Sequence, residues 1–290
     1  MFKNRSGQVR AGWIIMMAFI VVIVVQTVFQ VPGSLLLAAV ATPENPDVLV
    51  RHPWMFLLMQ GGGTAGGIVM TIVLWRFLNK KSVRALGFGG RFNDFWFGML
   101  LGAVSIVFIF LLLVATGNVT LINSLTDPEF TVLTFTFFII FILVAFFEEM
   151  FFRGYVMRTM ANRGNKKWLI YVGSALFFSV VHGTNPNVTV LGLVNIMLVG
   201  LLFAYMFDMT QSLWLPIGYH ITWNYFQGNV FGFPVSGTTP HGIYEVDVSI
   251  GNDWLTGGAF GLEGGIGATV LILIGFGVTK WYVKQTHALL

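Results

Sequence analysis

Two absences narrow the possible classes of this protein. The chain contains no cysteine among its 290 residues, which excludes disulfide bonds, a thiolate nucleophile and a thiolate metal site. Charged residues make up only 10% of the chain, whereas an average soluble domain has about 25%. So few charges cannot cover a water-facing surface in the usual way. The sequence therefore predicts a protein that lies mostly in lipid.

Long apolar runs fill most of the chain. Hydrophobic residues make up 56% of it, and the mean hydropathy is +0.79. A membrane-spanning helix needs roughly 20 predominantly apolar residues. Eight runs approach that length, over residues 12–36, 54–77, 95–116, 131–152, 168–183, 188–207, 213–231 and 266–282. This pattern predicts an all-α polytopic membrane protein with about eight transmembrane helices, which form a single integral membrane domain over residues 1–290.

The charges predict the orientation of these helices. Basic residues gather in every second connection, as in cytoplasmic loops, and include Lys3, Arg5, Arg10, Arg76, Lys80, Lys81, Arg84, Arg91, Arg158, Arg163, Lys166, Lys167, Lys280 and Lys284. Only Arg51 falls in a connection of the other kind. Those other connections carry Glu44, Asp47, Asp127, Glu129, Glu245, Asp247, Asp253 and Glu263. We therefore expect a multi-pass protein of the plasma membrane, with both termini cytoplasmic and the long connection 233–264 outside. The net charge of +4 fits orientation in the bilayer better than nucleic-acid binding.

Glu148 and Glu149 interrupt an apolar stretch that runs from Phe130 to Phe152. A charge in the hydrocarbon costs roughly 2.5–3.5 kcal/mol on insertion scales, so two adjacent carboxylates need compensation. Arg153 lies four residues after Glu149, on the same helix face, and is expected to pair with it. Adjacent helical residues diverge by about 100°. Glu148 is therefore left for chemistry.

Two histidines lie in later apolar runs. Glu148 is 15 residues before Arg163, and His182 is 15 residues after Lys167. Both side chains are therefore expected roughly 22 Å from the same predicted cytoplasmic turn. His220 is expected at a shallower depth of roughly 12 Å, a difference that helix tilt can absorb. The carboxylates and the two imidazoles can therefore share one level inside the membrane.

Polar residues accompany both histidines. Asn224 lies four residues after His220 and therefore shares its helix face. The segment Gly183–Asn187 follows His182 and ends that helix early. Irregular backbone at membrane depth is tolerated only where it is buried in protein or lines a water-filled cavity. The sequence therefore predicts a wet pocket at His182.

These groups suit hydrolysis by an activated water. Glu148 with His182 can orient and deprotonate the water, while His220 and Asn224 can donate hydrogen bonds to a developing oxyanion. Glu148, His182 and His220 are also candidate zinc ligands, because two histidines and one glutamate leave an open position for water. However, Asn224 suits an oxyanion donor better than a ligand, and no carboxylate is apparent as a partner for either histidine. These points favour a mechanism that requires no cofactor, with zinc as the alternative.

Other classes fit the sequence less well. The absence of a Gly-x-Ser-x-Gly motif disfavours a serine hydrolase, and the absence of His-Glu-x-x-His disfavours the usual metalloprotease. A transporter also places Glu, Arg and His near the midplane, but it should contain internal repeats, and none is found. A non-catalytic immunity or partner-binding membrane protein is a third hypothesis. Taken singly, the Glu149–Arg153 pair, His182 and Asn195 each suit a structural role between helices. All of these groups together at compatible depths favour a chemical site.

Three motifs follow one another along the chain. They are Glu148-Glu149-x-x-x-Arg153, Phe178-x-x-x-His182 and His220-x-x-x-Asn224. This set resembles the intramembrane proteases of the type II CAAX prenyl endopeptidase and bacteriocin-processing family. The resemblance covers residues 131–226, the motif-bearing catalytic core.

The resemblance implies an all-helical fold with eight spans and an intramembrane endopeptidase. It also implies that the first glutamate activates the water. The expected substrate is a hydrophobic or membrane-tethered peptide or protein. The predicted catalytic site comprises Glu148, Glu149, Arg153, His182, His220 and Asn224.

Overall fold

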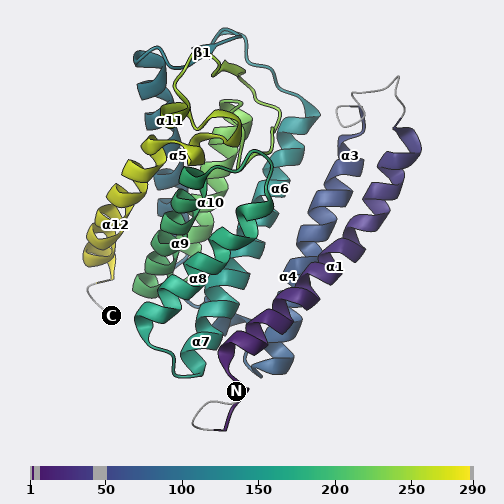
Figure 1. The fold of residues 1–290 in the computed structure, drawn as a ribbon, viewed down its shortest axis with the longest axis vertical. Helices are drawn as coiled ribbons and strands as arrows, with labels where there is room; N and C mark the ends of the chain where they lie inside the picture. Colours follow the sequence, from purple (N-terminus) through teal and green to yellow (C-terminus); the bar gives the residue numbers. More distant parts are fainter. Residues whose placement is uncertain (1, 3–6, 42–50, 288–290) are drawn as a thin grey trace.

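The chain folds as a bundle of helices in a computed structural model that describes residues 2, 7–41 and 51–287 (Figure 1). Among these residues, a helical segment occupies each of the eight predicted runs. The segments are α1 (Ala11–Val40); α3 (Pro53–Phe56) continued by η1 (Leu57–Gly61) and α4 (Gly62–Leu78); α5 (Asn93–Ala115); α6 (Val132–Glu148) continued by η3 (Glu149–Met157) and α7 (Arg158–Asn162); α8 (Lys167–Val181); α9 (Val190–Thr210); α10 (Trp214–Tyr225) continued by η5 (Phe226–Val230); and α12 (Ile266–Thr286).

Six of the described helical segments are long and apolar enough to cross a membrane. The two others are α8, with 15 residues, and α10, with 12 residues before the five of η5. Nearly every residue of α10 is buried, so the surrounding helices rather than lipid enclose it. The all-α polytopic membrane fold is thus confirmed, whereas the count of eight spans stays a prediction.

Large apolar side chains cover much of the outside of the bundle. Ile20 and Val28 of α1 and Leu100 and Phe108 of α5 are all exposed. Such wide apolar surfaces are unfavourable in water but match the hydrocarbon of a bilayer. The outer surface therefore agrees with a membrane location.

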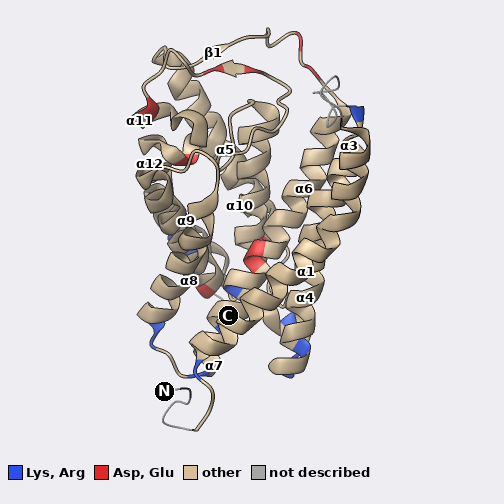
Figure 2. Ribbon diagram, turned by 45° about the vertical axis from the view of Figure 1, so that its right-hand side comes forward, with Lys and Arg blue, Asp and Glu red and all other residues tan. Residues whose placement is uncertain are grey.

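Charge is distributed unequally along the bundle. Figure 2 shows most of the Lys and Arg residues at the end of the bundle where α7 lies, and acidic residues in the connections at the opposite end. The start of α1 and the end of α12 point to the same end of the bundle, as an even number of crossings requires (Figure 1). Lys3, Arg5, Glu44 and Asp47, which entered the orientation prediction, lie outside the described residues.

Close packing against α5 fixes the position of α10. The spacing Gly98-x-x-x-Gly102 is a known signal for close helix approach in membranes. A Cβ atom added at Gly98 would overlap the backbone oxygen of Leu215, and one added at Gly218 would overlap that of Phe95. The two helices therefore contact each other through backbone, and α10 holds His220 and Asn224 in a fixed place.

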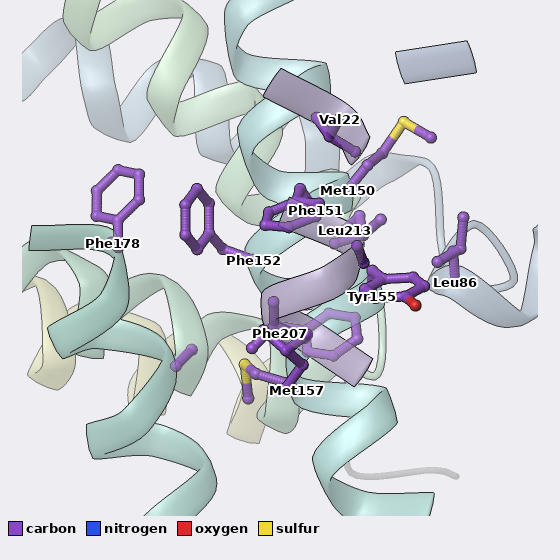
Figure 3. Close-up of a cluster of buried hydrophobic side chains, with 14 of the residues drawn as sticks. Val22, Leu86, Met150, Phe151, Phe152, Tyr155, Met157, Phe178, Phe207 and Leu213 are labelled. Carbon is purple, nitrogen blue, oxygen red and sulfur yellow. The ribbon is translucent and has the colours of Figure 1, made fainter. Parts of the chain in front are cut away.

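A buried hydrophobic cluster surrounds η3, the π-helical continuation of α6 (Figure 3). Phe151, Phe152 and Tyr155 are almost fully enclosed, and they pack in one cluster with Val22 of α1 and with Leu213. π-Helical segments are uncommon and often occur at functional sites. Here η3 begins at Glu149, so the core also holds the acidic pair in position.

The long connection after η5 folds over one end of the bundle. Its strand β2 (Val246–Asp247) pairs antiparallel with β1 (Thr120–Leu121) in the connection after α5. It then forms the short helix α11 (Asp253–Thr256) and two 3-10 turns, η6 (Gly258–Phe260) and η7 (Leu262–Gly264). The connection is therefore an ordered cap rather than a free loop.

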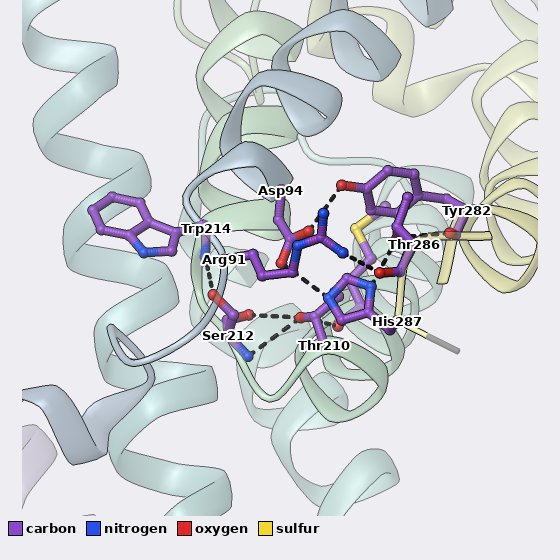
Figure 4. Close-up of polar contacts among 9 residues, drawn as sticks. Arg91, Asp94, Thr210, Ser212, Trp214, Tyr282, Thr286 and His287 are labelled. Atoms are coloured by element: carbon purple, nitrogen blue, oxygen red, sulfur yellow. Dashed lines mark hydrogen bonds and ion pairs between the residues drawn. The ribbon is translucent and has the colours of Figure 1, made fainter. Parts of the chain in front are cut away.

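Polar contacts join α12 to the start of α5 near the opposite end (Figure 4). The buried carboxylate of Asp94 accepts a 2.8 Å hydrogen bond from the Tyr282 hydroxyl and lies 3.4 Å from Nε2 of His287. Arg91 donates to the backbone oxygen of Thr286. These contacts tie the C-terminal helix to the bundle, away from the predicted site.

Candidate active site

One cavity of about 500 Å³ brings four of the predicted site residues together. Glu148 ends α6, His182 lies directly after α8, and His220 and Asn224 lie on α10, and all four side chains line this cavity. The structure thus brings these four residues to one cavity, while their depth in the membrane stays a prediction.

Glu149 points away from the cavity and is paired with Arg153. Their side chains have no exposed surface, and Nη1 of Arg153 lies 3.0 Å from Oε1 of Glu149. Arg153 also donates to the backbone oxygen of Gly200 at 3.3 Å. Its guanidinium lies 4.4 Å from the ring centroid of Phe178, a cation–π contact. The predicted ion pair is confirmed.

Glu148 has different surroundings from its neighbour. Its side chain keeps 17% of its surface and lines the cavity. The nearest imidazole contact of its carboxylate is Nε2 of His220, at 3.9 Å. The sequence pairs Glu148 with His182 instead, and no ion pair between these two side chains forms in the structure. They share the cavity without direct contact.

His220 lies between the two glutamates. Its Nδ1 is 3.1 Å from Oε1 of Glu149, while its Nε2 faces Glu148. A carboxylate only accepts hydrogen bonds, so Nδ1 carries the proton, and Nε2 carries one only in the imidazolium form. The expectation that no carboxylate partners either histidine is therefore wrong for His220. The expectation failed because the sequence assigns Glu149 to Arg153 alone, whereas Oε1 of Glu149 contacts both Arg153 and His220.

His182 is oriented by backbone. The oxygen of Phe178 lies 2.7 Å from Nδ1, in the last turn of α8, so this nitrogen carries the proton in the neutral ring. Nε2 is then an acceptor. The predicted early end of this helix is also found, because α8 stops at Val181 and a short 3-10 turn (His182–Thr184) follows.

Asn224 lies one turn beyond His220 and borders the cavity. Among the described residues, no hydrogen-bond partner is found for its side-chain amide. Its NH₂ group is therefore available to a ligand in the cavity, as an oxyanion donor must be.

The donor atoms do not fit a metal ion as they stand. Within the described residues, no group of three or more His, Asp or Glu side chains lies close enough to hold one. Glu149 nevertheless gives His220 the kind of carboxylate partner that metal-binding histidines usually have. The candidate ligands Glu148, His182 and His220 thus share a cavity without forming a coordination shell.

The cap contributes residues that sequence reasoning missed. Ser236, Thr238, Thr239 and Glu263 line the cavity from the long connection. No local pattern in this Gly-rich segment marks them, since only the fold of the cap brings them to the site. Asn195 was expected to join helices. The structure confirms this, because its Oδ1 accepts a 2.7 Å hydrogen bond from the hydroxyl of Thr269 in α12. Its Nδ2 also donates to the backbone oxygens of Glu263 and Gly265, which joins α9 to the cap.

The fold and the cavity define a polytopic membrane protein with a buried carboxylate–imidazole site. Residues 130–226 match the model of the family described as type II CAAX prenyl endopeptidase Rce1-like. This match confirms the family resemblance of the motif-bearing segment and supports a CAAX-type intramembrane endopeptidase in general. Searches of curated proteins and of solved structures found no significant match.

Proposed function

We propose that this cavity hydrolyses a peptide bond of a hydrophobic or membrane-tethered substrate, with Glu148 as the base that activates water. One observation carries the proposal. Of two adjacent glutamates, the buried Glu149 is neutralised by Arg153, whereas the half-buried Glu148 faces a cavity shared with His182, His220 and Asn224. A base must be free to accept a proton, and Glu148 meets that requirement.

The step requires a water beside Glu148 and a peptide carbonyl near Asn224. Glu148 takes a proton from the water, and the water oxygen bonds to the carbonyl carbon. Negative charge then develops on the carbonyl oxygen, which accepts a hydrogen bond from the amide of Asn224. Glu148 returns the proton to the leaving nitrogen as the C–N bond breaks.

The two histidines position the reacting groups. Nε2 of His182 is an acceptor and can hold the second hydrogen of the attacking water. His220 can donate from Nε2 to the oxyanion only as an imidazolium. Glu149 accepts the hydrogen bond from Nδ1 and thereby fixes the orientation of the ring. Glu149 and Arg153 therefore act through His220 and are positioning residues.

The cavity lining suits an apolar substrate. Phe137, Ile140 and Phe141 of α6 face the cavity together with Phe178 and Phe203. Burying apolar groups of a peptide against them contributes roughly 25 cal/mol per Å² removed from water. A substrate delivered within the lipid reaches these side chains without leaving an apolar environment.

The direct test compares membranes that contain the wild type with membranes that contain the Glu148→Gln variant. Quantitative proteomics should find new peptide termini in or near membrane segments only with the wild type. Gln keeps the size of the side chain but cannot accept the proton. Identical termini in the two samples would contradict the proposal.

The proposal includes an orientation, with both termini cytoplasmic and the cap on the outer face of the plasma membrane. The absence of cysteine allows single-cysteine labelling without background. We expect an impermeant thiol reagent to label Ser249→Cys in intact cells but not Lys81→Cys. The reverse pattern would contradict the orientation.

A further inference from the structure

A second carboxylate faces the same cavity from the cap. Glu263 lies in η7 and lines the cavity, with only 8% of its surface exposed. None of the catalytic roles above uses it. The cavity thus has two acidic walls, with Glu148 on the helices and Glu263 on the cap.

The Glu263 carboxylate is held firmly. Its Oε1 accepts a 3.2 Å hydrogen bond from the Ser236 hydroxyl, and its Oε2 accepts one from Nε2 of Gln227. Nδ2 of Asn195 donates to its backbone oxygen at 2.8 Å. Helices α9 and α10–η5 therefore fix both the backbone and the side chain of Glu263, as a residue that recognises a ligand requires.

The described part of the chain places no cation beside this carboxylate. None of the described residues that line the cavity is Lys or Arg, and the buried Arg153 is already paired with Glu149. Burial raises the pKa of Glu263 above its ordinary value, and the hydrogen bonds from Gln227 and Ser236 oppose that rise. A buried carboxylate is costly without an opposite charge, so a cation brought by a ligand would be favoured here.

The distance from Glu263 to the catalytic residues suits an extended peptide. Gln227, which binds its carboxylate, lies seven residues after His220 on one continuous helix. Seven residues correspond to roughly 10 Å along a helix. An extended peptide advances about 3.3 Å per residue. Asn224, the proposed oxyanion donor, is only three residues before Gln227, or roughly 5 Å along the helix. Glu263 therefore lies about one to three substrate residues away from the bond that would be cut.

We propose that Glu263 is a specificity residue that selects substrates with a lysine or arginine about one to three residues from the cleaved bond. This inference rests on the proposed function for the identity of the ligand as a peptide. The substrate class is thus an apolar, membrane-associated peptide with one nearby basic side chain, whose charge is paired by Glu263.

A purely structural role for Glu263 predicts different behaviour. If the side chain only anchors the cap to Gln227 and Ser236, its replacement lowers stability and slows all substrates equally. If the side chain binds a cationic group of the substrate, its replacement changes the ratio of kcat/KM between charged and neutral substrates. The ratio is therefore the decisive measurement.

The experiment uses the purified full-length protein in a neutral detergent. The probes are short quenched-fluorescent peptides of Leu, Phe and Ala that carry one lysine, moved position by position, or norleucine in its place. We expect the wild type to prefer lysine by about tenfold in kcat/KM at one position among the first three residues from the cut. Glu263→Gln should bring that ratio close to one, and Glu263→Lys should shift the preference to a glutamate peptide.

Two controls separate the possible failures. Asp253→Asn removes an exposed charge of the same cap and should leave the lysine preference intact. Binding of the same peptides to Glu148→Gln protein, read as thermal stabilisation, gives the ratio without turnover. If the Glu148→Gln protein binds lysine peptides selectively but the wild type cleaves none of them, the result would contradict the proposed function and support the specificity site. A lysine preference that survives in Glu263→Gln, or its absence from the wild type in both assays, would overturn the inference.

Discussion

The cavity has two walls that hold their charged groups in different ways. The helical wall is the side of the cavity that carries Glu148. There Arg153 neutralises Glu149, and the guanidinium also makes cation–π contacts. Backbone-to-backbone packing of α5 against α10 fixes the position of His220. On the cap wall, the neutral side chains of Ser236 and Gln227 donate hydrogen bonds to Glu263, and no described Lys or Arg lines the cavity. The helical wall thus pairs Glu149 with Arg153 and leaves Glu148 to the cavity, whereas the cap wall presents a carboxylate without a paired cation.

This difference suggests a division of labour. Groups that move protons must keep one geometry through the reaction, and rigid, densely packed helices provide it. Recognition of a basic substrate needs a carboxylate without a paired cation, and a cap over the helices can present one with few constraints on the catalytic core. Changes to the two walls should therefore have different consequences, and the following substitutions test that expectation.

The largest loss of stability is expected for Arg153→Ala. This change strands Glu149 as a buried charge, and removing one partner of a buried pair typically costs about 3–5 kcal/mol. The unfolding temperature in detergent should fall sharply, together with activity. An Arg153→Ala protein as stable as the parent would show that the Glu149–Arg153 ion pair does not stabilise the helices around the cavity.

A double variant distinguishes the charge from the packing. Replacing both members, as Glu149→Leu with Arg153→Met, removes the stranded charge, and such apolar replacements are often neutral for stability. We expect thermal stability to recover in large part while activity stays low, because His220 loses its carboxylate partner. Recovery of activity along with stability would contradict a positioning role for Glu149.

A smaller loss of stability is expected for Asn195→Ala, which loosens the attachment of the cap. Its amide donates to the buried backbone oxygens of Glu263 and Gly265 at 2.8 and 3.0 Å. Leaving such groups unsatisfied costs about 1–3 kcal/mol. Asn162→Ala, at an exposed position, is the control and should change stability by less than about 0.5 kcal/mol. Equal unfolding temperatures for the two variants would contradict the attachment.

The smallest effect is expected from metal removal. Since the carboxylate and imidazole groups of the cavity do not form a coordination shell, exhaustive chelation should leave hydrolysis by the purified protein unchanged. Elemental analysis of the same sample is the companion measurement. Stoichiometric zinc, with activity lost on its removal and restored on its return, would make Glu148, His182 and His220 ligands instead.

The helical wall could be predicted from the sequence because its signals are local. Four-residue spacing pairs Glu149 with Arg153, and a break after His182 ends α8, so helix periodicity alone places these groups. The divergence of adjacent residues separates Glu148 from Glu149 in the same way. The lengths of the apolar runs give the helices themselves.

The remaining features depend on contacts between distant segments. The Glu149–His220 contact joins residues 71 positions apart, and no spacing rule specifies which oxygen accepts. The π-helical turn at Glu149 has no sequence marker of its own. Glu263 reaches the cavity only because the cap folds back through Gln227 and Asn195. By contrast, the spacing of Gly98 and Gly102 is a local signal that could have predicted the close approach of α5 and α10.

The central claim is that two adjacent glutamates have opposite tasks, and purified Glu148→Gln and Glu149→Gln proteins test it side by side. Thermal unfolding and peptide hydrolysis should be measured on the same preparations. We expect Glu148→Gln to unfold close to the parent temperature and to lose hydrolysis by roughly 10²–10⁴, the usual contribution of a general base. Glu149→Gln should unfold at a clearly lower temperature, because Arg153 is left without its charge partner. Near-normal turnover by Glu148→Gln, or an unchanged unfolding temperature for Glu149→Gln, would contradict the account.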